Sequence, residues 1–170
     1  MSAVTQPVTL EEAKAFLRVD GTDEDAVITS MLAAAIAEAE DITHARITGQ
    51  TVTWNQAEPG ILPVRPVSGV TVSVDGAVVS SSLYLFAPSE GTGPAVIGWL
   101  DGFPEGEVTV TMTVGFSSQT LPAPIRQWIL ARVSTFFEQR EMFITGINVH
   151  EFGHEFYQAL LDPYILHGGF

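Results

Sequence analysis

Apolar residues at helical spacing mark the start of the chain. Thr9 and Glu12, three positions apart, form the pattern of a capping box before an apolar run. We expect a short helix from there to about Val19, ended by Asp20-Gly21. The apolar side of this helix consists of Leu10, Ala13, Phe16 and Leu17.

A longer helix should follow. Thr22 or Asp23 is its expected N-cap, its first turn is acidic, and Gly49 marks its exit. Its apolar stripe consists of Ile28, Met31, Leu32, Ala35, Ile36 and Ala39. The small alanines in this stripe favour close packing against another helix.

Between residues 50 and 118 the pattern changes from helical spacing to strict alternation. Val52 and Trp54 share one face of a strand, and Asp75-Gly76 is typical of a hairpin turn. Further alternating apolar positions are Val70, Val72, Val74, Val108, Val110, Met112 and Val114. We interpret the glycines at 91, 93 and 98 as turn residues. The segment is therefore predicted to form antiparallel strands with one buried face.

Helical spacing returns near residue 121. Pro124 suits the first turn of a helix. The apolar face that follows consists of Ile125, Trp128, Ile129, Val133, Phe136 and Phe137. An aromatic stripe of this kind indicates core packing. Arg132 lies beside the stripe, so its charge either pairs with an acid or extends to solvent.

Together these elements predict an α+β fold, a mainly helical bundle that carries an inserted antiparallel module. Residues 1–49 and 119–147 should form the helical core, and residues 50–118 the small β module. Residues 148–170 should form a C-terminal arm.

Charge and composition narrow the function. The 170 residues carry a net charge of −13, so their surface should repel nucleic acid phosphates rather than grip DNA. The chain has no cysteine, which excludes disulfides, thiol catalysis and cysteine-based zinc sites. Its first residues lack the pattern of a secretory signal, and no apolar stretch is long enough for a bilayer. We therefore expect neither secretion nor membrane insertion.

The sequence HEFGH at residues 150–154 matches the H-E-x-x-H signature of zinc peptidases. On a helix, His150 and His154 would bind the metal on one face, and Glu151 would act as general base. Tyr157 and Leu160 stand where the extended motif requires Gly and His. Other possible third ligands beyond the motif are Asp162 and His167. The motif alone therefore leaves open a zinc site or an apolar segment used for contact.

Five longer stretches, taken in order, carry more than a secondary-structure pattern. They are LEEAKAFLRVDGTDEDAVITSMLAAAIAEAEDIT, ILPVRPVSGVTVSVDG, GWLDGFPEGEVTVTMTVGF, LPAPIRQWILARVSTFFEQRE and FGHEFYQALLDPYI. In this order they resemble phage head–tail connector (adaptor) proteins of tailed phages, prophages and gene transfer agents. One departure is Phe103-Pro104, where the family usually has Trp-Pro.

The resemblance implies structural work in the virion neck, without catalysis, cofactor or metal. Such adaptors, assembled in the host cytoplasm, form a dodecameric ring beneath the portal protein. They bind the next neck or tail protein, and DNA passes through the lumen without being bound. The C-terminal segment of such proteins typically reaches the portal, which here points to Phe152, Phe156, Tyr157, Leu160, Leu161, Pro163 and Tyr164. Under this resemblance HEFGH is a coincidence.

Two alternatives stand beside the adaptor. The first is a small zinc hydrolase that uses His150, Glu151 and His154. The second is another oligomeric neck or tail protein, such as a tail terminator. The order of helices, β insertion and helix argues against the second, because tail terminators are usually built around a sheet.

Overall fold

The computed structural model of the chain describes residues 5–55, 60–102, 104–145 and 159–165. The fold combines α-helices with antiparallel sheets, in agreement with the predicted α+β class. Two compact units divide the chain. A β unit comprises Met1–Thr5 and Ala45–Ser117, and a helical unit comprises Gln6–His44 and Ser118–Phe170.

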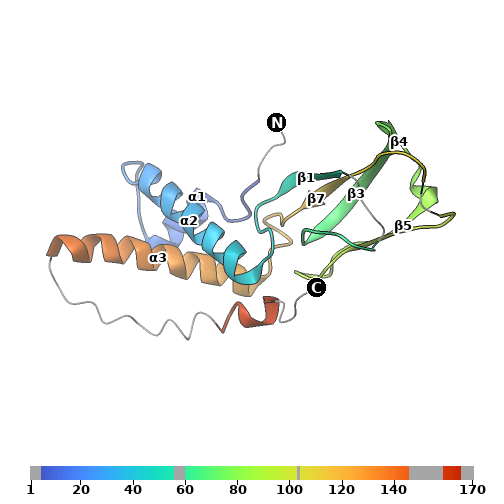
Figure 1. Cartoon of the computed structure of the whole chain (residues 1–170). Helices are drawn as coiled ribbons and strands as arrows, with labels where there is room; N and C mark the ends of the chain where they lie inside the picture. The colour runs from blue at the N-terminus through green and yellow to red at the C-terminus, as the bar shows by residue number, and fades with distance from the viewer. Residues whose placement is uncertain (1–4, 56–59, 103, 146–158, 166–170) are drawn as a thin grey trace. The chain divides into compact units, whose positions relative to one another are not determined.

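The helical unit contains α1 (Leu10–Leu17), α2 (Asp25–Thr43), α3 (Ala123–Thr145) and the short 3-10 helix η2 (Asp162–Tyr164). α2 packs along α3, and α1 contacts both (Figure 1). Fully or nearly fully buried apolar side chains from these helices include Ile28, Leu32, Ala35, Ile36, Ala39, Ile125, Trp128, Ile129 and Val133. Among the described helices, none is both long and apolar enough to cross a membrane.

α1 begins as predicted but ends earlier. The Thr9 hydroxyl accepts a hydrogen bond from the backbone N–H of Glu12 at 3.2 Å, which is the N-cap half of the expected capping box. The helix ends at Leu17 because Arg18 adopts a left-handed conformation with φ of 58°. Its predicted apolar side is partly wrong, since Phe16 is 41% exposed while Lys14 is buried.

The bounds of α2 also differ from the prediction. The helix begins at Asp25, and Glu24 occupies the N-cap position without making the capping hydrogen bond from its side chain. Thr22 contributes its carbonyl oxygen instead, which accepts from the backbone N–H of Asp25 at 3.2 Å. His44, with φ of 52°, ends the helix well before Gly49. The predicted stripe is buried apart from half-buried Met31.

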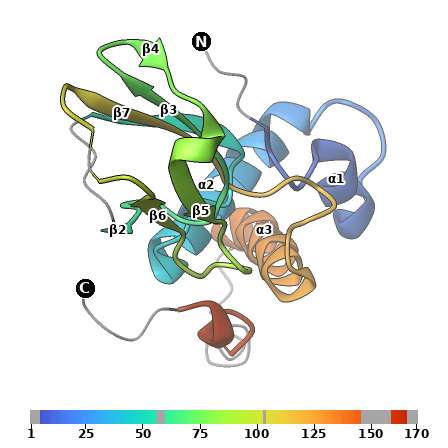
Figure 2. The same ribbon diagram turned by 90° about the vertical axis from the view of Figure 1, so that its right-hand side faces the viewer.

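The β unit consists of two antiparallel sheets. The first has the order β1-β7-β3-β4, formed by Gln50–Asn55, Val108–Val114, Val67–Val74 and Ala77–Val78. The second has the order β2-β6-β5, formed by Gly60–Ile61, Val96–Trp99 and Tyr84–Ala87, and the 3-10 helix η1 (Ser81–Leu83) precedes β5. Both sheets are seen in Figure 2. Gly98, interpreted from the sequence as a turn residue, lies within β6.

One hydrophobic cluster joins the inner faces of these sheets. It includes Val67, Val72, Tyr84, Ile97, Val108, Val110, Met112 and Val114, with Val52, Trp54, Phe86 and Trp99 packed against it. The predicted hairpin is present, because Asp75 and Gly76 both have positive φ and connect Val74 to its partner Ala77. The Asp75 carboxylate also accepts from the backbone N–H of Glu107 at 2.9 Å.

Candidate functional site in the helical unit

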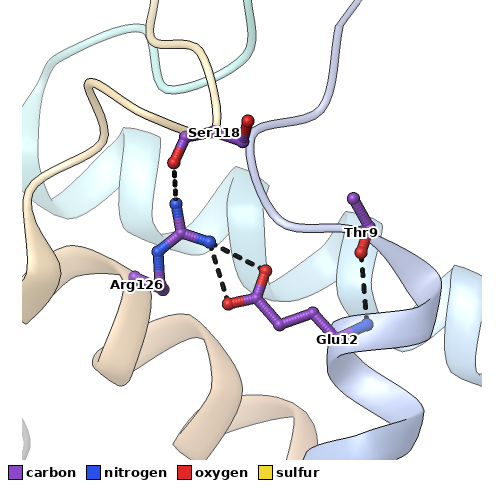
Figure 3. Close-up of polar contacts among 4 residues, drawn as sticks. All are labelled: Thr9, Glu12, Ser118 and Arg126. Atoms are coloured by element: carbon purple, nitrogen blue, oxygen red, sulfur yellow. Dashed lines mark hydrogen bonds and ion pairs between the residues drawn. The ribbon is translucent and has the colours of Figure 1, made fainter.

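An ion pair joins α1 to α3. Nη1 of Arg126 donates to both carboxylate oxygens of Glu12, at 2.8 and 2.7 Å (Figure 3). The other terminal nitrogen of Arg126 donates to the backbone oxygen of Ser118, just before α3. Glu12 therefore links the start of α1 to α3 through its side chain, while its backbone N–H is capped by Thr9.

A second pair joins α2 to α3. Nε of Arg132 donates to Glu38 at 2.7 Å. The guanidinium carbon also lies 4.6 Å from the centroid of the Phe136 ring, within the range of a cation–π contact. Of the two alternatives for Arg132, pairing with an acid is confirmed.

The buried side chain of Lys14 on α1 has polar partners for its charge. Its ammonium lies 2.6 Å from Oδ1 of Asp25 and donates to the backbone oxygen of Gly21. The hydrogen bond to Asp25 raises the pKa of Lys14 above its usual 10.5, whereas desolvation acts in the opposite direction. Lys14 thus connects α1, the loop after it and the first residue of α2.

The three ion pairs affect the charge of the surface that the helical unit presents to a partner. They engage three of the chain's seven basic side chains with carboxylates of the helical unit itself. The chain has 20 acidic residues and seven basic ones, so carboxylates far outnumber the basic side chains that could pair with them. A partner of the helical unit would therefore meet a predominantly acidic surface.

The C-terminal segment is described only from residue 159 to 165. Leu161 is fully buried, and the backbone N–H of Tyr164 donates to its carbonyl oxygen at 2.8 Å. Leu160 and Tyr164 are half-buried, while Pro163 is exposed. Three further predicted docking residues lie outside the described residues, namely Phe152, Phe156 and Tyr157. Docking of this segment on a portal stays a prediction.

The zinc motif also lies outside the described residues, so the geometry of His150, Glu151 and His154 is not tested. Within the residues that the structure does describe, no group of three or more His, Asp or Glu side chains could hold a metal ion. The described part of the molecule therefore adds no support to the zinc hypothesis.

The β unit has an exposed apolar surface that the sequence pattern did not predict. Exposed large apolar side chains occur at Ile61, Leu83, Leu85, Val96 and Leu100 in and beside the second sheet, and at Val78 on the edge strand β4 of the first. The signal was present in YLFA and VIGWL, where apolar residues occupy both alternating positions instead of one. Such a pattern is typical of strands covered on both faces.

Comparisons with known proteins agree with this architecture. Residues 7–83 match the model of the family described as phage gp6-like head-tail connector protein. That range includes α1, α2 and the first strands of the β unit. The comparison with curated proteins found no match.

Solved structures extend the likeness to the whole chain. A chain in the neck of an empty gene transfer agent particle, computed with C6 symmetry, has a TM-score of 0.71 and 23% identity, covering 99% of this chain and 96% of that one. A chain in the virion of a native gene transfer agent particle has a TM-score of 0.68 and 23% identity, covering 98% and 95%.

A third chain comes from the neck of a native gene transfer agent particle computed with C12 symmetry. Its TM-score is 0.64 at 20% identity, and the match covers 99% of this chain and 98% of that one. At these identities the three likenesses show a shared fold over nearly the full length. The family match over residues 7–83 confirms what the sequence pattern predicted, a resemblance to the phage head–tail connector proteins.

Proposed function

We propose that the chain is a structural head–tail adaptor of a tailed phage or a phage-like particle. Copies of the chain form a ring that docks beneath the portal protein and links it to the next neck or tail protein. The observation that carries this proposal is the connector family match at residues 7–83. The full-length likeness to chains of particle necks supports it, because those necks were computed with C6 and C12 symmetry.

The charge of the chain suits such a ring. A net charge of −13 disfavours tight contact with phosphates, so DNA can pass through an acidic lumen without being held. The three ion pairs of the helical unit keep several of the few basic side chains engaged within the protein. This leaves fewer cations to bind DNA.

In this proposal the three parts of the chain have different roles. The helical core predicted at residues 1–49 and 119–147 builds the ring body, and residues 50–118 form the inserted β module. In the structure residues 1–5 and 45–49 group with the β unit. The arm of residues 148–170 docks on the portal. Leu161 anchors the described part of the arm by its burial, and Pro163 and Tyr164 are candidates for the contact.

The test is co-sedimentation with the portal protein encoded in the same genome. The full chain is expected to bind in a saturable ratio that corresponds to a ring. A chain truncated after Ile147 is expected to lose binding, but it also loses the buried Leu161. A second variant therefore keeps Leu161 and replaces Phe152, Phe156 and Tyr157 with serine.

Three outcomes separate the parts of the proposal. Loss of binding by the triple variant, with an unchanged circular dichroism spectrum, supports an adaptor that docks through its arm. Binding by both variants supports the adaptor and contradicts the assignment of the arm. Failure of the full chain to bind contradicts the portal as its partner. Binding to a tail tube in place of the portal would favour the tail-terminator alternative.

The zinc hydrolase is tested separately on the purified chain. We expect no stoichiometric zinc after equilibration with the metal, and no change in metal content in His154→Ala. One zinc per chain, lost in that variant together with a peptidase activity, would contradict a purely structural role. A Glu151→Gln variant then distinguishes a catalytic site, which loses activity and keeps zinc, from a metal site without catalysis.

A further inference from the structure

The outer face of the β2-β6-β5 sheet is aliphatic. Antiparallel pairing sets Ile61 opposite Val96 and Val96 opposite Ala87, and it sets Leu85 opposite Gly98. The ladder continues beyond the strands, because the backbone N–H of Leu100 donates to the carbonyl of Leu83 at 3.2 Å. Side chains alternate along strands, so the strand positions share the face opposite to the buried one, and exposed Leu83 and Leu100 adjoin them at the ends of the strands. We call this surface the aliphatic face; it consists of Ile61, Leu83, Leu85, Ala87, Val96, Gly98 and Leu100.

The aliphatic face is exposed and bears no charged or polar side chain at these positions. Leu85 is 63% exposed and Leu100 is 52% exposed. The neighbouring strand positions Tyr84, Ile97 and Trp99 point the other way and belong to the core or pack against it. The sheet is therefore apolar on both sides, although only one side meets the core of this chain.

The other sheet of the same unit provides an internal comparison. Its inner face is equally apolar, but its outer face carries hydroxyl groups along β1, β7 and β3, and the one exposed large apolar side chain among its described residues is Val78, opposite Ser73 on the edge strand β4. Thr53, Thr111 and Thr71 form one cross-strand row, and Thr51 pairs with Thr113. This threonine face is the composition expected of a sheet that faces water. The aliphatic face departs from it at every position, which indicates a surface covered by protein in the assembled state.

The chemistry of the face limits what covers it. A basic partner would be attracted to carboxylates, which this face lacks. A second copy of the chain, in contrast, needs a contact surface without carboxylates. Each copy carries a net charge of −13, so two copies repel wherever acidic surfaces meet. A charge-free apolar surface is where such copies can approach without that repulsion.

From this combination we propose that the aliphatic face is a subunit contact, covered by a neighbouring copy of the same chain in the ring. The inference rests on the proposed ring function and names the surface that the ring uses. A closed ring requires a head-to-tail contact, so the face meets a different surface on the neighbour. The β unit thereby contributes to assembly, in addition to the helical core.

The experiment uses the absence of cysteine from the chain. A single Leu85→Cys substitution gives one attachment point for benzophenone maleimide on the aliphatic face. Thr71→Cys gives the matched control on the threonine face, because Thr71 is also exposed and also lies in a strand. Each labelled full-length chain is bound to the portal at saturation, sedimented and irradiated, and the products are identified by mass spectrometry.

We expect the label at position 85 to give mainly dimers of this chain, with the label joined to a peptide outside the aliphatic face. The label at position 71 should give at least about tenfold less dimer, since that face remains hydrated. Products joined mainly to the portal, or equal dimer yields from both positions, would overturn the inference. Portal binding is measured in the same samples. A chain that binds the portal without forming dimers contradicts the proposed contact, whereas a chain that does not bind the portal contradicts the adaptor function.

A charge substitution gives a second readout without a label. Leu85→Asp places a carboxylate on the aliphatic face, whereas Thr71→Asp places it on the other sheet. Both positions are exposed, so neither change disturbs the buried cluster. We expect half-saturation of the portal to need about tenfold more of the Leu85 variant, with the Thr71 variant close to the unaltered chain. Equal binding by the two variants contradicts the proposed contact.

Discussion

Glu12 and Arg126 connect α1 to α3 within the helical unit, across a sequence separation of 114 residues. One guanidinium nitrogen donates to both oxygens of the carboxylate, and the other contacts the backbone before α3. The sequence assigned the Glu12 carboxylate to a capping box at the start of α1, but it pairs with Arg126 of α3.

The strength of this connection can be measured by a double-mutant cycle. Glu12→Gln, Arg126→Met and their combination should give a coupling free energy of about 0.5–1 kcal/mol, because both side chains are partly exposed and screened by water. Urea unfolding at low salt measures it, and the coupling should fall in 1 M salt. A coupling near zero at low salt would mean that the pair contributes no stability.

Lys14 predicts an alkaline loss of stability. Its pKa is raised in the folded chain by the hydrogen bond to Asp25, so the folded state binds this proton more tightly than the unfolded state. The contribution is fully present below about pH 10.5 and is lost as pH rises through the higher, folded-state pKa. Unfolding of the unaltered chain and Lys14→Met should therefore differ by a constant amount at neutral pH and by less above pH 10.5.

Asp25→Asn is the matched control for this prediction. It removes the partner whose hydrogen bond raises the pKa of Lys14, so its stability should also depend less on pH in the alkaline range. If the unaltered chain and both variants lose stability in parallel above pH 10.5, Lys14 is not the group responsible.

Leu161 tests whether the described part of the arm belongs to the folded chain. Replacing this fully buried leucine with alanine should lower the free energy of unfolding by about 2–4 kcal/mol, through lost burial and the cavity left behind. The half-buried neighbour Leu160, changed to alanine, should cost clearly less. Similar small effects from both changes would show that Leu161 is not packed in solution.

Gly115 is a position where the backbone of the β unit leaves no room for a side chain. Its φ is +85°, and an added Cβ would lie 2.5 Å from the carbonyl carbon of Thr48. Gly115→Ala should therefore cost about 3 kcal/mol or more, since backbone atoms would have to move. Gly76, with φ of +80° and open space around it, is the control.

Thermal or urea unfolding of both variants separates two effects. Gly76→Ala should show the backbone strain alone, about 1–2 kcal/mol. Gly115→Ala should exceed it by the cost of the contact with Thr48. If the two alanine variants are equally stable, the close approach of residues 48 and 115 is not present in solution.

Much of the fold could be predicted because it depends on local periodicity. The apolar spacing of Ile28, Leu32 and Ala35 identified one face of α2, and strict alternation identified β7. Helix ends were less predictable. Arg18 and His44 end their helices in left-handed conformations, which are uncommon for residues other than glycine, so no glycine at either position marked these ends.

The docking residues predicted in the arm stay a prediction. The apolar content of the arm marked it for contact, but its residues at 148–158 lie outside the described structure. The aliphatic face was missed because YLFA and VIGWL were not recognised as strands. Only cross-strand register shows that Leu85, Val96 and Ile61 share an outer face.

The α+β class and the order of the elements could be read from the chain alone, because short-range spacing carries both, and the five ordered stretches carried the connector resemblance. Long-range folding places Lys14 against Asp25 and Glu12 against Arg126. It also decided which side of the second sheet remains uncovered. Each of these depends on where a partner distant in the sequence lies in space, and local spacing carries no record of that position.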